Sequence, residues 1–496
     1  MRGPGIINNR IFTDAVGIRK YSPTGGILLK YTRLDQELNG KSLIAGAGFL
    51  IFCLFMVCPA APEHWAEMYR FFGRVLLVSF MALFFCHYRF RGKFEVNLVL
   101  CYALWFMASR FLNGDHWMAR EPDLVLTRFL CAAMLGLGPM LDREGRRRFL
   151  NCFCVAVGIF YFVSGALAIV VNLLDTYVYL PPENVLFGLD EPWHIHYINV
   201  FNTNRTISSL WFYIALCMMI YQFFSCRNKW WRIPIVLAGL LFYVAIALVF
   251  SRTVKLICSV SFAMLAMLLA LQYLPLKKLW QKAAILILCA ALLIPLTFKS
   301  FDWTAGLMGD VSSLLLSETT AEGGSAGVDF SDNRDLGKDI SNLSERSQIF
   351  ASFIPSLQLS PRRIFVGCFS DKLMSIPNLF VDFPIPFTHM HNFLLEAFML
   401  TGLLGFFLIV FFCLRLVIRM LHLFFTQDQR VSLADKVLTL PLTGILLYGM
   451  FEVVIFTACS DRRAPTDMRE LSFFLIAGMV LACSQDVLPR LRDLKK

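Results

Sequence analysis

The sequence predicts an all-α polytopic membrane protein with about twelve transmembrane helices and one large extracytoplasmic loop. Composition is the first reason, since the 496 residues are 57% hydrophobic and only 16% charged, with a mean hydropathy of +0.62. Soluble domains carry about 25% charged residues. The second reason is that apolar runs of roughly 17–25 residues recur, long enough to cross a hydrocarbon layer of about 30 Å. The third is a regular alternation of basic and less basic loops.

The twelve apolar runs are expected to be helices, because a span in lipid has to satisfy its own backbone hydrogen bonds. Nine of them lie within 42–301 and three within 391–485. Residues 1–41 and 486–496 are expected to be basic cytoplasmic tails. The runs cover 42–60, 71–88, 94–112, 122–141, 149–174, 207–225, 233–250, 254–274, 283–301, 391–414, 437–457 and 471–485.

Two longer polar segments separate these runs, at 175–206 and 302–390. Long connections in compact proteins are usually functional or irregular. Lys and Arg counts place both segments outside, because the alternate loops hold 21 basic residues and the N-terminal tail holds seven more. The net charge of +11 therefore reflects membrane topology and gives no indication of nucleic-acid binding.

Charged residues inside the spans are the first indication of function, because each costs roughly 2.5–3.5 kcal/mol on insertion scales. All six of these span-embedded residues lie in the predicted external half of their spans. Arg252 lies on the same predicted side, in a short hairpin between two spans. Snorkelling would explain single cases but not a one-sided distribution. We expect an outward-opening polar pocket whose guanidinium groups suit a diphosphate. The residues are Arg74, Arg110, Arg128, Lys299, Glu396 and Glu452.

The dipeptide His391-Asn392 stands where the long external segment ends and the tenth run begins. A histidine there can act as a general base or hold a phosphate, although an interfacial histidine bonded to a headgroup is the plain alternative. Asn392 would fix the imidazole or bond a sugar, and at a spacing of four it shares a helix face with Glu396. His389 is a rival for either role.

Two His-x-His patterns, at His194/His196 and His389/His391, leave a divalent-cation site open as an alternative. The spacing is unspecific, so no metal ligand is assigned and no cofactor is expected. Arg205 and Arg346 are external arginines that composition alone would rate as solvated.

Together these motifs resemble the O-antigen ligase and O-antigen polymerase superfamily of bacterial membrane glycosyltransferases. The pattern His391-Asn392-Phe-Leu-Leu followed by Gly402-Leu-Leu-Gly405 is similar to the motif at the exit of that family's periplasmic loop. The hairpin Ser251-Arg252, the segment Asn202–Arg205 and the loop arginine Arg346 are similar to further motifs, in the same order. Phe350 stands where the family often has tryptophan, and Gly367-Cys368-Phe369 lacks the second glycine of a loop element.

The resemblance implies a glycosyltransferase C-like enzyme of the bacterial cytoplasmic (inner) membrane with both termini cytoplasmic. Its donor would be a glycan on undecaprenyl diphosphate, and its acceptor a glycan or lipid hydroxyl. His391, Arg252 and Arg346 would be catalytic, with His391 as base and arginines in place of a metal. The substrate-binding set would comprise Arg205, Asn392, Arg74, Arg128, Glu396 and His389.

Ligase and polymerase use the same donor, so the sequence leaves both open. A flippase or transporter of lipid-linked saccharide is an alternative of another class, and an inert scaffold is a third. A flippase needs polar residues in both halves of its path, whereas the sequence places embedded charges only in the outer half.

Overall fold

The computed structural model describes residues 28–57, 66–88, 93–112, 121–173, 205–249, 251–274, 278–319, 361–367, 392–428, 430–452, 455 and 468–487. The chain divides into two compact units, Met1–Leu43 and Ile44–Lys496. Of the first unit only its helical end, from Leu28, is described. The arrangement given below is that of the second unit.

The described residues are mostly helical and include no strand, which confirms the predicted all-α class. The helices are α1 (Leu28–Val57), α2 (Ala66–His87), α3 (Phe94–Leu112), α4 (Glu121–Met140), α5 (Arg143–Leu173), α6 (Arg205–Ser225), α7 (Arg232–Leu248), α8 (Arg252–Tyr273), α9 (Leu279–Thr319), α11 (Pro361–Val366), α13 (Phe393–Phe425), α14 (Leu433–Val437), α15 (Thr439–Gly449) and α16 (Met468–Val487).

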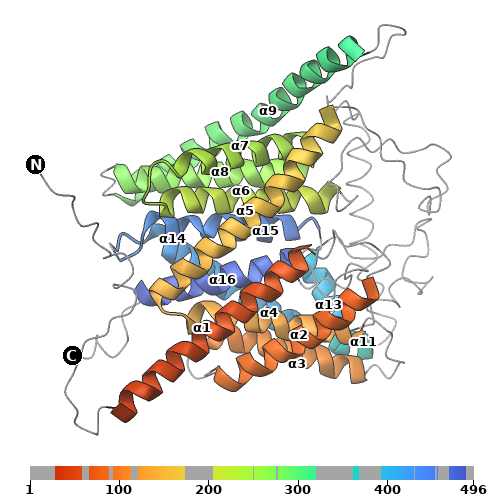
Figure 1. Ribbon diagram of the computed structural model, residues 1–496, viewed down its shortest axis with the longest axis vertical. Helices are drawn as coiled ribbons and strands as arrows, with labels where there is room; N and C mark the ends of the chain where they lie inside the picture. Colours follow the sequence, from red (N-terminus) through yellow and green to blue (C-terminus); the bar gives the residue numbers. More distant parts are fainter. Residues whose placement is uncertain are drawn as a thin grey trace, which may run out of the picture. The chain divides into compact units, whose positions relative to one another are not determined.

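The helices of the second unit form two groups that meet along α15 and α16 (Figure 1). In one group α4 packs against α16, α3 and α2, while α13 packs against α3 and α16. In the other, α6 packs against α7 and α8 against α9, and α5 contacts both α6 and α7. The C-terminal helices thus pack against helices from early and middle parts of the chain.

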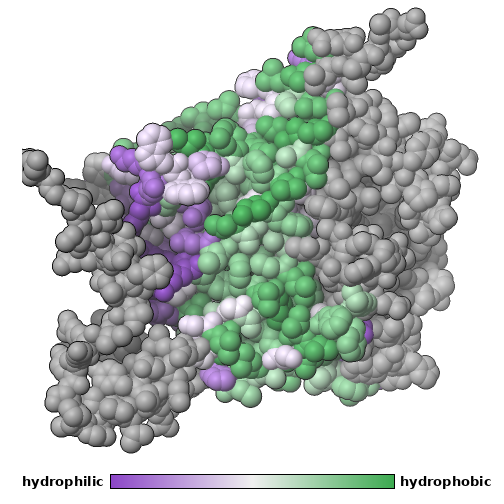
Figure 2. Space-filling view, viewed as in Figure 1, coloured by the Kyte–Doolittle hydropathy of each residue, from purple (hydrophilic) through white to green (hydrophobic). Residues whose placement is uncertain are grey.

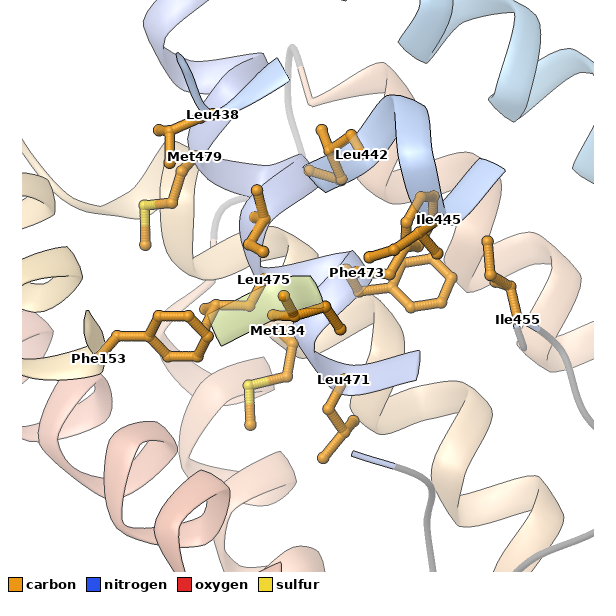
Figure 3. Close-up of a cluster of buried hydrophobic side chains, with 14 of the residues drawn as sticks. Met134, Phe153, Leu438, Leu442, Ile445, Ile455, Leu471, Phe473, Leu475 and Met479 are labelled. Carbon is orange, nitrogen blue, oxygen red and sulfur yellow. The ribbon is translucent and has the colours of Figure 1, made fainter. Parts of the chain in front are cut away.

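A close crossing of α4 and α16 lies in the centre of the core. A Cβ built on Gly138 would stand 2.1 Å from the carbonyl oxygen of Gly478, so the two backbones touch there. Small residues allow such an approach between membrane helices. Buried apolar side chains surround the crossing, among them Met134, Phe153, Leu438, Leu442, Ile445, Leu471, Phe473, Leu475 and Met479 (Figure 3).

An apolar band covers the middle of the described surface (Figure 2). Within the described residues six helices are long and apolar enough to cross a membrane, in α3, α4, α5, α8, α9 and α13, and α1, α2, α6 and α7 contain shorter apolar segments. The α9 side chains within Trp280–Leu314 are almost all outside the protein core, as expected for a helix that faces lipid. The count of twelve spans stays a prediction.

Two helix ends differ from the predicted boundaries. Helix α9 continues to Thr319, past residue 301 where the long loop was expected to begin. Helix α1 begins at Leu28, so residues 28–41 are helical although the sequence predicts a tail there. In both places polar residues extend a helix beyond its apolar run, which a hydropathy criterion does not detect.

Candidate functional site

Asn392 fixes the start of α13. It is the N-cap: its Oδ1 accepts hydrogen bonds from the backbone N–H of Leu394 (2.9 Å) and Leu395 (3.2 Å). Its Nδ2 donates to the carbonyl oxygen of Met450, just beyond the end of α15, at 3.1 Å. The sequence predicts a helix that opens here, and this is confirmed. The side chain, only 8% exposed, therefore joins two helix ends.

Glu396 lies one turn into α13 and is fully buried. The sequence predicts that Glu396 shares a helix face with Asn392. Asn392 is not itself helical, because it has extended backbone angles (φ −154°, ψ 123°), and its side chain caps the helix. Glu396 is instead among the electrostatic partners of Arg128, on α4. A charge in the first turn of α13 therefore interacts electrostatically with a charge in the first half of α4.

Arg128 and Glu470 form an ion pair inside the helix packing. Both side chains are 1% exposed, and Nη1 of Arg128 donates to Oε1 of Glu470 on α16. The Arg128 guanidinium also lies 5.2 Å from the ring centre of Phe106, a distance at which cations are attracted to aromatic faces. These contacts give Arg128 a role in packing, and its predicted role toward a diphosphate stays a prediction.

Arg74 has a carboxylate partner of its own. Its Nε and Nη2 donate to the two oxygens of Asp123 at 2.6 and 2.8 Å, which is the bidentate geometry of a strong charge-assisted pair. Asp123 is 2% exposed, whereas 38% of the Arg74 side chain is accessible. Of the two predicted donor-binding arginines Arg74 and Arg128, Arg74 is thus the one whose side chain is accessible at the protein surface.

Helix α13 is broken at Gly402, which has φ 67° and ψ −164°. Side chains of α3 bond to the carbonyl oxygens just before the break: Nη2 of Arg110 donates to Leu400 at 2.5 Å and Nε1 of Trp105 to Thr401 at 2.8 Å. Main-chain groups in an apolar layer need such partners. Arg110 is therefore held by the fold and does not simply snorkel.

The short helix α11 fills the same break from another side. A Cβ on Gly367, at φ 82°, would stand 2.5 Å from the backbone of Leu400 and Thr401, and a Cβ on Gly402 would stand 2.4 Å from that of Phe365. Only glycine combines a left-handed backbone with such close approach. The glycines Gly367 and Gly402, both quoted for the family resemblance, thus meet in space.

Arg252 begins α8 and is half-buried beside the buried N-cap residue Ser251. One turn on, the buried Nζ of Lys255 lies 3.5 Å from Oδ1 of Asp302 on α9. The predicted position of Arg252 in a short hairpin between two helices is confirmed by α7 and α8, which end at Leu248 and begin at Arg252.

Several predicted site residues lie outside the described part of the chain. These are His391, His389 and Arg346, together with both histidines of the other His-x-His pattern. Arg205 is the first residue of α6, and only its backbone is described. Among the described residues no group of three or more His, Cys, Asp or Glu side chains could hold a metal ion.

The structure adds buried ionisable residues that the sequence prediction did not use. Asp123, Glu470 and Lys255 are buried, and all three stand near helix starts. Glu95 corrects the one-sided distribution: it is 3% exposed in the first turn of α3, where Arg415 (3.0 Å) and Arg419 (3.3 Å) of α13 donate to it. A buried charge therefore also exists in the half of the spans that is predicted to be cytoplasmic. The sequence could have indicated it, because Glu95 lies inside the predicted span 94–112.

Neither the family models nor the curated proteins compared with this chain give a match. The candidate site is therefore defined by the described geometry alone. It consists of a helix start anchored by Asn392, the partly accessible Arg74 paired with Asp123, and the buried ion pair of Arg128 and Glu470. Buried pairs of this kind can hold a reaction site rigidly, and an accessible cation can attract an anion.

Proposed function

We propose that this chain is a metal-independent, O-antigen ligase-like membrane glycosyltransferase with a glycosyltransferase C-like fold. It would transfer a glycan from undecaprenyl diphosphate to an acceptor hydroxyl at the outer face of the bacterial cytoplasmic membrane. Both termini would be cytoplasmic, with twelve spans and the long segment before His391 outside. The described helices and apolar band support the membrane setting.

The anchoring of Asn392 is the observation that supports this proposal most. The residue before it in the chain is His391, the proposed base. A base has to be held at a fixed position relative to the acceptor hydroxyl. Three hydrogen bonds of the Asn392 side chain fix the adjoining backbone to the ends of α13 and α15.

In the proposed reaction His391 takes the proton of the acceptor hydroxyl while the acceptor oxygen bonds to the anomeric carbon. The bond from that carbon to the diphosphate oxygen breaks, and undecaprenyl diphosphate leaves with the electron pair. Guanidinium groups stabilise the charge that develops on the leaving group. We assign this stabilisation to Arg252 and Arg346, and we assign Arg205 and Arg74 to donor binding. The buried Arg128 and Glu396 would support the site from within the helix packing.

The test is transfer by the purified chain with an undecaprenyl-diphosphate-linked donor and a defined acceptor. His391→Ala, Arg252→Ala and Arg346→Ala should each abolish product and undecaprenyl diphosphate release. Arg148→Ala is the matched control, since that arginine is 77% exposed near the start of α5 and pairs, within the described residues, with Glu144 alone. Full activity in all three variants would contradict the proposal. Product analysis then separates a ligase from a polymerase.

A translocator of lipid-linked saccharide is a second candidate, favoured by two observations. Broken helices are typical of transporter sites, and α13 is broken at Gly402. Glu95 with Arg415 and Arg419 supplies polar groups in the other half of α3 and α13. Movement of a labelled donor across proteoliposomes without glycan transfer would favour this candidate.

A further inference from the structure

A cleft is lined by the start of α5, by α14 with the loop before it, and by the end of α16. These segments are far apart in the sequence and lie at the same end of the helices (Figure 1). The charged lining residues of the cleft are Arg143, Arg146, Arg147, Arg430, Asp435 and Asp486. Four arginines and two aspartates give the lining a surplus of two positive charges. Figure 2 shows hydrophilic side chains gathered at this end, beside the apolar band.

Both aspartates of the lining already have partners. Oδ2 of Asp435 accepts hydrogen bonds from the backbone N–H and the hydroxyl of Ser432, at 3.0 and 2.7 Å. Asp486 accepts from Nη2 of Arg146. Asp486 is thus paired with Arg146, and Arg430 is paired with Asp428, a loop residue beside it. The guanidinium groups of the lining that have no carboxylate partner in the described chain are those of Arg143 and Arg147.

The two sides of the cleft are connected to each other. Nη2 of Arg143, on α5, donates to the carbonyl oxygen of Arg430, in the loop before α14. Arg146, 6% exposed, donates through Nη1 to the carbonyl oxygen of Leu141 at 2.9 Å. These bonds hold the guanidinium groups around the cleft without a ligand, so the arrangement is organised in advance.

Arg147 is the lining residue whose donors remain open. It is half-buried against the cleft, and within the described chain it has no hydrogen bond, ion pair or aromatic contact. The α5 N-terminus does not compete for an anion, because Asp142 caps it by accepting from the N–H of Gly145 at 2.8 Å. An anion in the cleft would meet guanidinium groups.

We propose that this cleft binds a phosphate group, carried either by an anionic lipid headgroup or by free phosphate. Guanidinium forks match phosphate oxygens in pairs. Basic pockets between membrane helices at headgroup level bind such phosphates. The site is separate from Asn392 and Arg252 and does not depend on glycan transfer.

The test uses the full purified chain and three probes: phosphatidylglycerol and phosphatidylcholine in mixed micelles, and sodium phosphate against chloride at equal ionic strength. Lipid retained per protein is measured by native mass spectrometry, and stability by the thermal unfolding midpoint. The double variant Arg143→Gln/Arg147→Gln removes two cleft cations, and Arg148→Gln is the control outside the cleft. Wild type and control should retain phosphatidylglycerol about tenfold or more better than the double variant.

If sodium phosphate raises the midpoint of wild type but not of the double variant, and phosphatidylglycerol shows no preference, the ligand is free phosphate and the site is supported. Equal responses of wild type and double variant to both phosphatidylglycerol and sodium phosphate overturn it. Should the double variant fail to fold, Arg147→Gln alone decides by the same comparison, because Arg147 has no partner within the described chain to lose.

Discussion

Arg128 donates to Glu470 across 342 residues of sequence, and both side chains are 99% buried. The pair joins α4 to α16, and the carboxylate of Glu396 on α13 also interacts electrostatically with the Arg128 guanidinium. A buried pair is costly to break from one side, by about 3–5 kcal/mol, but its replacement by apolar residues is often tolerated.

We therefore predict that Arg128→Ala lowers the thermal unfolding midpoint strongly. The double variant Arg128→Met/Glu470→Leu should recover most of that loss. Activity should follow stability if Arg128 acts only through packing. A double variant that is stable yet inactive would instead give Arg128 the donor-binding role that the sequence predicts. Arg252→Ala serves as the comparison, because the proposed reaction assigns its guanidinium to the diphosphate, and its loss of activity should exceed what any change in its midpoint explains.

The meeting of α11 with the break in α13 gives a second prediction. Gly402→Ala and Gly367→Ala should each destabilise the chain by more than about 1–2 kcal/mol, because a left-handed backbone already costs that much before any clash, and Cβ contacts of 2.4–2.5 Å with main-chain atoms follow. Gly306→Ala in α9 is the control, with open space around it. Unfolding midpoints measure the difference, and equal midpoints for all three would contradict the contact.

Substitutions of Asn392 separate its cap from its anchor. Asn392→Asp keeps an oxygen for the N–H groups of Leu394 and Leu395 but loses the donor to Met450. Asn392→Ala loses both and should cost about 1 kcal/mol more from the cap alone. We expect transfer activity to fall already in Asn392→Asp if the anchor positions His391. Activity retained there and lost only in Asn392→Ala would point to the cap.

Single replacement of the two histidines distinguishes their roles. His391→Ala should remove transfer, whereas His389→Ala should leave most of it, because His391 adjoins the anchored residue Asn392. The readout is product formation at saturating donor. The reverse pattern would make His389 the base.

The loop before α14 provides a pH prediction outside the spans. The Arg430 guanidinium bonds to Asp428 and lowers the pKa of that carboxyl from 3.8 to about 2. A lowered folded-state pKa gives stability that is complete above pH 3.8 and disappears as the pH falls toward 2. The midpoint difference between wild type and Asp428→Asn should hence be constant from pH 5 to pH 8 and shrink below about pH 4. A difference that changes between pH 5 and pH 8 would contradict this pairing.

The same variant bears on the proposed phosphate site. Asp428→Asn removes the carboxylate that Arg430 now holds through Nε and Nη2. The positive charge of Arg430 is then no longer neutralised by Asp428. We therefore expect phosphatidylglycerol retention in the cleft to rise a fewfold at neutral pH. Reduced phosphatidylglycerol retention in this variant would show that Arg430 stabilises the loop and does not take part in phosphate binding.

The sequence by itself determined the helical class, the apolar segments and the start of α13 at Asn392. These follow from local properties: hydropathy over one span, and a capping residue before an apolar run. It also indicated that Gly402 and Arg128 matter, without their reasons. Only the tertiary structure decided that Arg128 pairs with Glu470, Arg74 with Asp123 and Glu95 with Arg415. The partner of a buried charge depends on which helices pack together, and hydropathy along the chain does not determine that packing.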